Sequence, residues 1–114
     1  MTNQILETIN PQIAVLFMCG GVNEVARQFL DMLRYCKNKH LHIDNLFFDT
    51  SNIKSNQKDC FFQLLDYLRH NKTKHAVVFY DRKEYNKCPW THILEPFRDA
   101  KRIKLHFAKD NVTI

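Results

Sequence analysis

An unbroken apolar run, Ile13-Ala14-Val15-Leu16-Phe17-Met18-Cys19, closes on the two glycines of the chain, Gly20-Gly21. A strand that is apolar on both faces is typical of the middle of a parallel sheet that helices cover on both sides. Asn23 then offers a helix N-cap, and apolar residues recur at steps of three and four as far as Cys36. We therefore expect a strand over 13–19 and an amphipathic helix over 23–37. The side chains expected on its buried face are Val25, Ala26, Phe29, Leu30, Leu33 and Cys36.

The same alternation continues along the rest of the chain. Strand patterns cover 41–48, 75–80 and 103–108, a polar loop is expected over 49–59, and a helix is expected from Cys60 to Leu68. A last helix is expected to open at Cys88-Pro89 and to be kinked or shortened at Pro96. The order β-α-β-α-β-α-β predicts an α/β fold, a three-layer, mostly parallel sheet of four to five strands with helices on both faces. Residues 1–12 are expected to be an N-terminal lead, and 13–114 a single domain.

Composition narrows the class of protein. The 114 residues are 45% apolar and 25% charged, which is typical of one globular domain. The longest apolar run is too short to cross a bilayer, and no basic segment with a following apolar stretch opens the chain, so we expect a cytoplasmic protein without a membrane partner. Seventeen Lys and Arg against twelve Asp and Glu give a formal charge of +5, which is compatible with a polyanionic partner. The basic residues are dispersed rather than gathered in one block.

The four cysteines are expected to be reduced thiols. Cys36-x3-His40-x-His42 and Cys88-x3-His92 have spacings seen among zinc ligands, but no CxxC pair is present. Cys36 also falls on the apolar face of a predicted helix, where a thiol packs as a small apolar group. We therefore expect no metal and no other cofactor.

Candidate binding residues follow the predicted strands, because ligands of open parallel sheets bind beyond the carboxyl ends of the strands. Gly20-Gly21 precede a helix N-terminus, where free N–H groups can hold an anion; a turn that needs positive φ is the simpler interpretation. An arginine such as Arg82 can bind a phosphate through two N–H groups, and a salt bridge at the sheet rim is the alternative. The residues expected to form an anion or phosphate site are Gly20, Gly21, Ser51, Lys58, Arg82 and Lys83.

Three motifs resemble the N-terminal catalytic domain of the resolvase/invertase serine recombinases, and the resemblance covers residues 13 to about 110. Val15 to Gly21 is similar to the family's Tyr-x-Arg-x-Ser strand end, with Gln28 at the place of a helical glutamine. Residues 48–52 and 58–61 are similar to its Asp-x-x-Ser-Gly loop and to the following helix entry. Residues 77–85 resemble the strand that ends in Asp-Arg-Leu-x-Arg. The resemblance implies a role in DNA site-specific recombination, often within mobile elements.

Departures from the family pattern fall on its catalytic positions. In the alignment that the resemblance implies, Gly21 occupies the position of the family's serine nucleophile. Cys19, Lys58 and Tyr85 occupy positions where the family has arginines. The family's catalytic residues that this sequence would retain are Asp49, Asp81 and Arg82. Attack on a phosphodiester requires an activated hydroxyl and a cationic clamp, so we expect no strand cleavage.

Three functions stay open on the sequence. The first is an inactive resolvase-like domain that binds DNA weakly and non-specifically, or binds another protein chain, and that can be a homodimer. The second is an active small α/β enzyme that uses Cys19 or Ser51 as its nucleophile. The third is a structural interaction domain in which Tyr85, Trp90 and Phe97 contact a partner chain.

Overall fold

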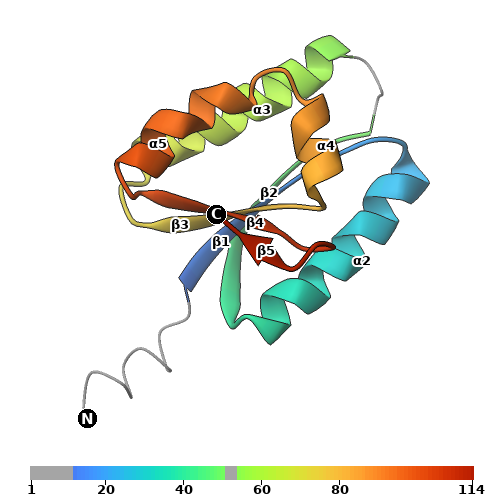
Figure 1. The fold of residues 1–114 in the computed structure, drawn as a ribbon. Coiled ribbons are helices and arrows are strands. Elements are labelled where there is room, and N and C mark those ends of the chain that lie inside the picture. The colour runs from blue at the N-terminus through green and yellow to red at the C-terminus, as the bar shows by residue number, and fades with distance from the viewer. Residues whose placement is uncertain (1–11, 51–53) are drawn as a thin grey trace.

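The computed structural model describes residues 12–50 and 54–114, and it has an α/β fold (Figure 1). Its sheet has the order β2-β1-β3-β4-β5, which confirms the predicted mostly parallel sheet. The strands β1 (Gln12–Cys19), β2 (Leu41–Asp49), β3 (His75–Phe79) and β4 (Ile103–Phe107) are parallel, and β5 (Val112–Thr113) pairs antiparallel with β4. All of the expected N-terminal lead except its last residue lies outside the described residues.

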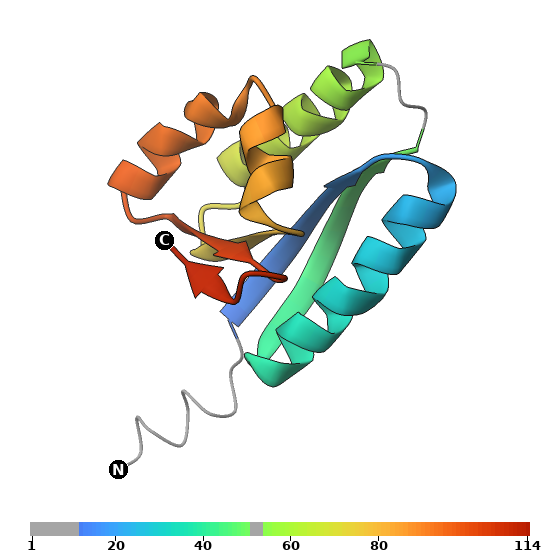
Figure 2. The same ribbon diagram turned by 45° about the vertical axis from the view of Figure 1, so that its right-hand side comes forward.

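Helices lie on both faces of the sheet. The helix α2 (Val22–Asn38) covers one face, and α3 (Lys54–His70) and α5 (Glu95–Asp99) lie on the other (Figures 1 and 2). The short helix α4 (Arg82–Lys87) follows β3, and a 3-10 helix, η1 (Thr91–Leu94), leads into α5. Within the described part of the chain, no helix has both the length and the apolar content that crossing a bilayer requires.

The apolar run of β1 supplies both halves of the core. Val15 and Phe17 pack in the cluster beneath α3, whereas Leu16 and Met18 pack in the cluster beneath α2. Because β1 lies inside the sheet, with α3 packed on one of its faces and α2 on the other, each face needs its own apolar side chains. The sequence pattern of this strand is therefore a direct consequence of its central position.

The buried face of α2 differs in part from the predicted one. Val25 and Cys36 are buried as expected, but Ala26 and Leu30 are exposed. The remaining buried positions of α2 are taken by Gln28, Met32 and Tyr35. A hydrogen bond of 2.7 Å joins the Tyr35 hydroxyl to Nδ1 of His106 in β4, so a partner far along the chain helps to set the rotation of this helix.

Two predicted boundaries are wrong. The helix α3 begins at Lys54, inside the loop expected over 49–59. The helix expected to open at Cys88 is instead divided: α4 ends at Lys87, and Cys88 is its C-cap. Pro96 lies in the first turn of α5, in agreement with the expected shortening, and the carbonyl of His92 accepts a hydrogen bond from the N–H of Glu95.

Candidate binding site at the carboxyl ends of the strands

A cavity of approximately 220 Å³, here called the carboxyl-end cavity, opens where β1 ends. Phe17, Cys19 and Gly20 contribute from β1 and its turn, and Glu24 contributes from the first turn of α2. The residues that line it from α4 and the segment after α4 are Glu84, Lys87, Cys88 and Trp90. A smaller hollow, of approximately 20 Å³, shares Cys19, Glu84 and Cys88 and is also lined by Gln28.

The two glycines after β1 have different roles. Gly20 has a φ of 145°, and its N–H donates to the carbonyl of Asp49 over 3.1 Å. A Cβ atom on Gly20 would lie 2.8 Å from Oε2 of Glu24, so the carboxylate of that side chain lies directly against this turn. Gly21 is the N-cap of α2 in an ordinary extended conformation, with φ −68° and ψ 162°. The geometry of Gly20 therefore matches the turn with positive φ rather than an anion site, because its N–H already donates to a carbonyl.

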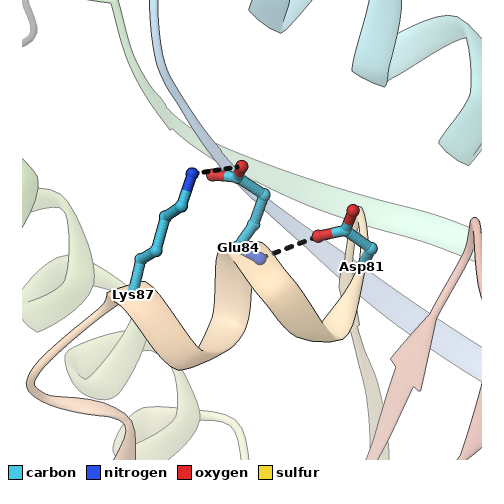
Figure 3. Close-up of polar contacts among 3 residues, drawn as sticks. All are labelled: Asp81, Glu84 and Lys87. Carbon is cyan, nitrogen blue, oxygen red and sulfur yellow. Dashed lines mark hydrogen bonds and ion pairs between the residues drawn. The ribbon is translucent and has the colours of Figure 1, made fainter.

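Asp81 caps a helix. Its side chain accepts a hydrogen bond from the backbone N–H of Glu84 over 2.7 Å, and only 8% of the residue is exposed (Figure 3). Glu84 in turn pairs with Lys87, with 3.3 Å between Oε1 and Nζ (Figure 3). The cap thus fixes the first turn of α4 and places the Glu84 carboxylate beside the cavity.

The cationic residues predicted to hold an anion are placed apart from the carboxyl-end cavity. The Arg82 guanidinium lies 5.4 Å from the centre of the Phe107 ring, and the backbone N–H of Arg82 donates to the Asp110 carboxylate over 2.9 Å. Lys83 is exposed on α4, and Lys58 lies on α3 with its Nζ 5.9 Å from the Phe62 ring. None of these three cations lines the cavity. Ser51 lies outside the described residues.

The charges around Cys19 oppose thiolate formation. Burial raises the pKa of the Cys19 thiol from 9.0 to about 11, and the neighbouring Cys88 thiol and the carboxylates of Glu84, Asp49 and Glu24 contribute to this rise. A thiol with this pKa is protonated at neutral pH, and the same carboxylates repel a phosphate. Lys87 is the single cation that lines the carboxyl-end cavity among the described residues, and it is paired with Glu84.

Sequence reasoning missed the two glutamates of this site. Neither Glu24 nor Glu84 is among the candidate residues that the sequence analysis singles out. A signal for the second was present, because Asp81-x-x-Glu84 has the spacing of an N-cap residue and the third residue of a helix. Within residues 12–50 and 54–114, no three His, Cys, Asp or Glu residues gather in a way that would hold a metal ion.

Comparison with family models, curated proteins and solved structures gives no match to this chain.

Proposed function

We propose that this chain is a resolvase-like domain that does not cleave DNA and that acts as a binding module. The observation that carries the proposal is the acidic lining of the carboxyl-end cavity, at the end of the strand that carries the resemblance. Strand cleavage requires a nucleophile and cations that neutralise the phosphoryl oxygens. At the corresponding turn, Gly21 has no side chain, Cys19 holds its proton, and the carboxylates of Glu24 and Glu84 line the space.

The strand order supports a binding role at this edge. In the order β2-β1-β3-β4, the connection that leaves β1 runs outward to β2 and the connection that leaves β3 runs outward to β4, so the two diverge between β1 and β3. Ligands of doubly wound sheets of the flavodoxin-like kind bind at such a switch point, between the ends of the first and third strands. The carboxyl-end cavity takes its lining from the end of β1 and from α4, which follows β3.

A plasmid assay tests the absence of cleavage. Supercoiled plasmid is incubated with the wild-type chain, with Gly21→Ser, and with the double variant Cys19→Arg/Gly21→Ser; an active serine recombinase serves as the positive control. We expect neither a nick nor a protein–DNA adduct that survives denaturation from the wild type or from Gly21→Ser, because restoring the hydroxyl alone leaves it among carboxylates. An adduct formed by the wild-type chain would overturn the proposal.

A protein-interaction domain is the second candidate, and exposed apolar side chains favour it. Val22 and Leu30 on α2 are 67% and 56% exposed, and Phe48 at the end of β2 is 55% exposed. Where exposed apolar side chains lie next to one another, they form the kind of patch that binds other chains. Of the residues predicted to contact a partner, Tyr85 is instead buried against Phe79 and Phe107, so the structure corrects that prediction.

Sedimentation equilibrium tests self-association through α2. The wild-type chain is compared with Leu30→Glu and with the control Arg27→Glu, which changes charge on an exposed position of the same helix. A dimer that only Leu30→Glu dissociates would support this candidate. A monomeric wild type would exclude self-association.

A further inference from the structure

A second cavity, here called the basic cavity, lies at the opposite edge of the sheet, where β3 and β4 begin. Its volume is approximately 430 Å³. Five basic side chains line it, together with one acidic side chain, that of Asp99. The five are Lys74, Arg98, Lys101, Arg102 and Lys104.

The parallel register of β3 and β4 creates this concentration of charge. His75 pairs with Ile103, so Lys74 and Arg102, which directly precede these residues, meet at the same edge. In the sequence, Lys74 and Arg102 are about thirty residues apart, and neither lies in a long run of basic residues. The fold therefore gathers on one edge a large part of the excess positive charge of the chain.

Most of these charges have no carboxylate partner. Arg98 pairs with Glu95 over 3.1 Å, but no ion pair joins Lys74, Lys101 or Lys104 to a carboxylate within the described ranges. Arg102 is held by neutral groups: its guanidinium donates to the carbonyls of Leu68 and Asn71, over 2.6 and 2.9 Å. The basic cavity therefore keeps a net positive charge that an anion would neutralise.

The donors of the basic cavity suit a chain of phosphates better than a single phosphate. A built phosphate cradle uses free backbone N–H groups. Here the N–H groups of His75, Lys101 and Arg102 already donate to carbonyls, over 2.9, 2.8 and 2.9 Å. What remains is a set of basic side chains around a concave surface. This arrangement is typical of contacts to a nucleic-acid backbone, which carry no base specificity.

The apolar surface of the chain argues against a lipid surface at the same place. Binding to an anionic membrane combines basic residues with exposed apolar side chains that enter the headgroup region. The large apolar side chains that the structure shows as exposed are Val22, Leu30, Phe48, Phe62 and Val112, and none of them lines the basic cavity.

We propose that the basic cavity binds the phosphodiester backbone of nucleic acid. This goes beyond the proposed function, because it names the partner and places it at the edge opposite the carboxyl-end cavity. It does not depend on whether the carboxyl-end cavity is catalytic.

Two triple variants of equal charge test the proposal. In Lys74→Gln/Lys101→Gln/Lys104→Gln the basic cavity loses three charges. In the control Lys37→Gln/Lys39→Gln/Lys109→Gln, three exposed lysines outside that cavity are changed instead. Binding of a short fluorescein-labelled DNA duplex is followed by anisotropy between about 50 and about 200 mM salt. Circular dichroism verifies that both variants are folded.

We expect the wild-type chain to bind, with an affinity that falls steeply with salt. The basic-cavity variant should bind at least about tenfold more weakly, and the slope of log affinity against log salt should decrease by about two to three, since each lost phosphate contact removes about one unit. The control should stay within about threefold of the wild type. An equal loss in both variants, a loss in the control alone, or no binding by the wild type at about 50 mM salt would overturn the proposal. So would tighter binding to phosphatidylserine vesicles than to DNA.

Discussion

At the turn after β1, two adjacent glycines allow one substitution to be compared in two backbone conformations. Gly20 has a φ of 145°, which side-chain-bearing residues rarely adopt, and a Cβ there would contact the Glu24 carboxylate. Gly21 is an N-cap in an ordinary conformation, where serine is a favoured residue. We expect Gly20→Ser to lower the free energy of unfolding by more than about 1 kcal/mol, and Gly21→Ser to change it by a few tenths at most. Urea unfolding measures both, and equal losses would contradict this account of the turn.

The thiol of Cys19 is expected to react slowly with electrophiles. Because its pKa is raised from 9.0 to about 11, the thiolate fraction at pH 7 is about a hundredfold lower than in an unperturbed thiol. The rate of alkylation by iodoacetamide should therefore increase about tenfold with each pH unit between pH 7 and 10. Peptide mass mapping, with Cys19→Ser as the control, assigns the modified site. A rate at pH 7 equal to that of a free cysteine peptide would instead favour an enzyme that uses this thiol.

Among the elements, α4 shows that a cap can define a helix that apolar periodicity does not reveal. The helix has six residues and one buried side chain, Tyr85, which is too few for a periodic pattern. Its start is marked by Asp81, whose carboxylate binds the N–H of Glu84. Apolar periodicity therefore predicts no helix between the strand over 75–80 and Cys88, where the structure has the capped helix α4. Strands β1 to β4 and helix α2 are predicted at nearly their observed positions, whereas α3 begins at Lys54 rather than at Cys60.

Substitution of Asp81 separates a capping role from a charge-dependent one. Asp81→Ala removes the acceptor of the Glu84 N–H and should lower the free energy of unfolding by about 1 kcal/mol. Asp81→Asn keeps a side-chain oxygen at the N-cap and should stay within a few tenths of the wild type. Thermal and urea unfolding of the three proteins provide the comparison. If Asn costs as much as Ala, the carboxylate charge rather than the cap is what this position requires.

For the molecule as a whole, the sequence predicts the sheet but not the two cavities. The order of strands and helices along the chain and the fold class follow from local patterns of apolar residues, such as the run over residues 13–19. The charge of each cavity comes from residues that are distant in the sequence and meet only through the fold. Glu24 and Glu84 meet across the ends of β1 and β3, and Lys74 meets Arg102 through the register of β3 and β4. The overall charge of +5 therefore does not reveal that the charged side chains lining one cavity are mainly acidic and those lining the other mainly basic.

The stability of the whole domain should fall at alkaline pH, because its buried thiols and phenols favour their protonated forms. Burial raises the pKa of Cys36 from 9.0 to about 11 and that of Cys60 to about 12; burial and the Asp44 carboxylate raise that of Tyr67 to about 12. The folded state then holds more protons than the unfolded state above about pH 9, so the contribution is complete below that pH and is lost as pH rises toward 11 to 12.

Each buried thiol contributes up to about 1.4 kcal/mol per pH unit within that range. Urea unfolding at a series of pH values between about 8 and 10.5 measures the slope. The variant Cys36→Ala/Cys60→Ala should be less stable at pH 8, because it leaves cavities in the core, and yet should lose stability less steeply with pH. A slope that the double variant leaves unchanged would show that other groups, such as Tyr67, control the alkaline limit of this fold.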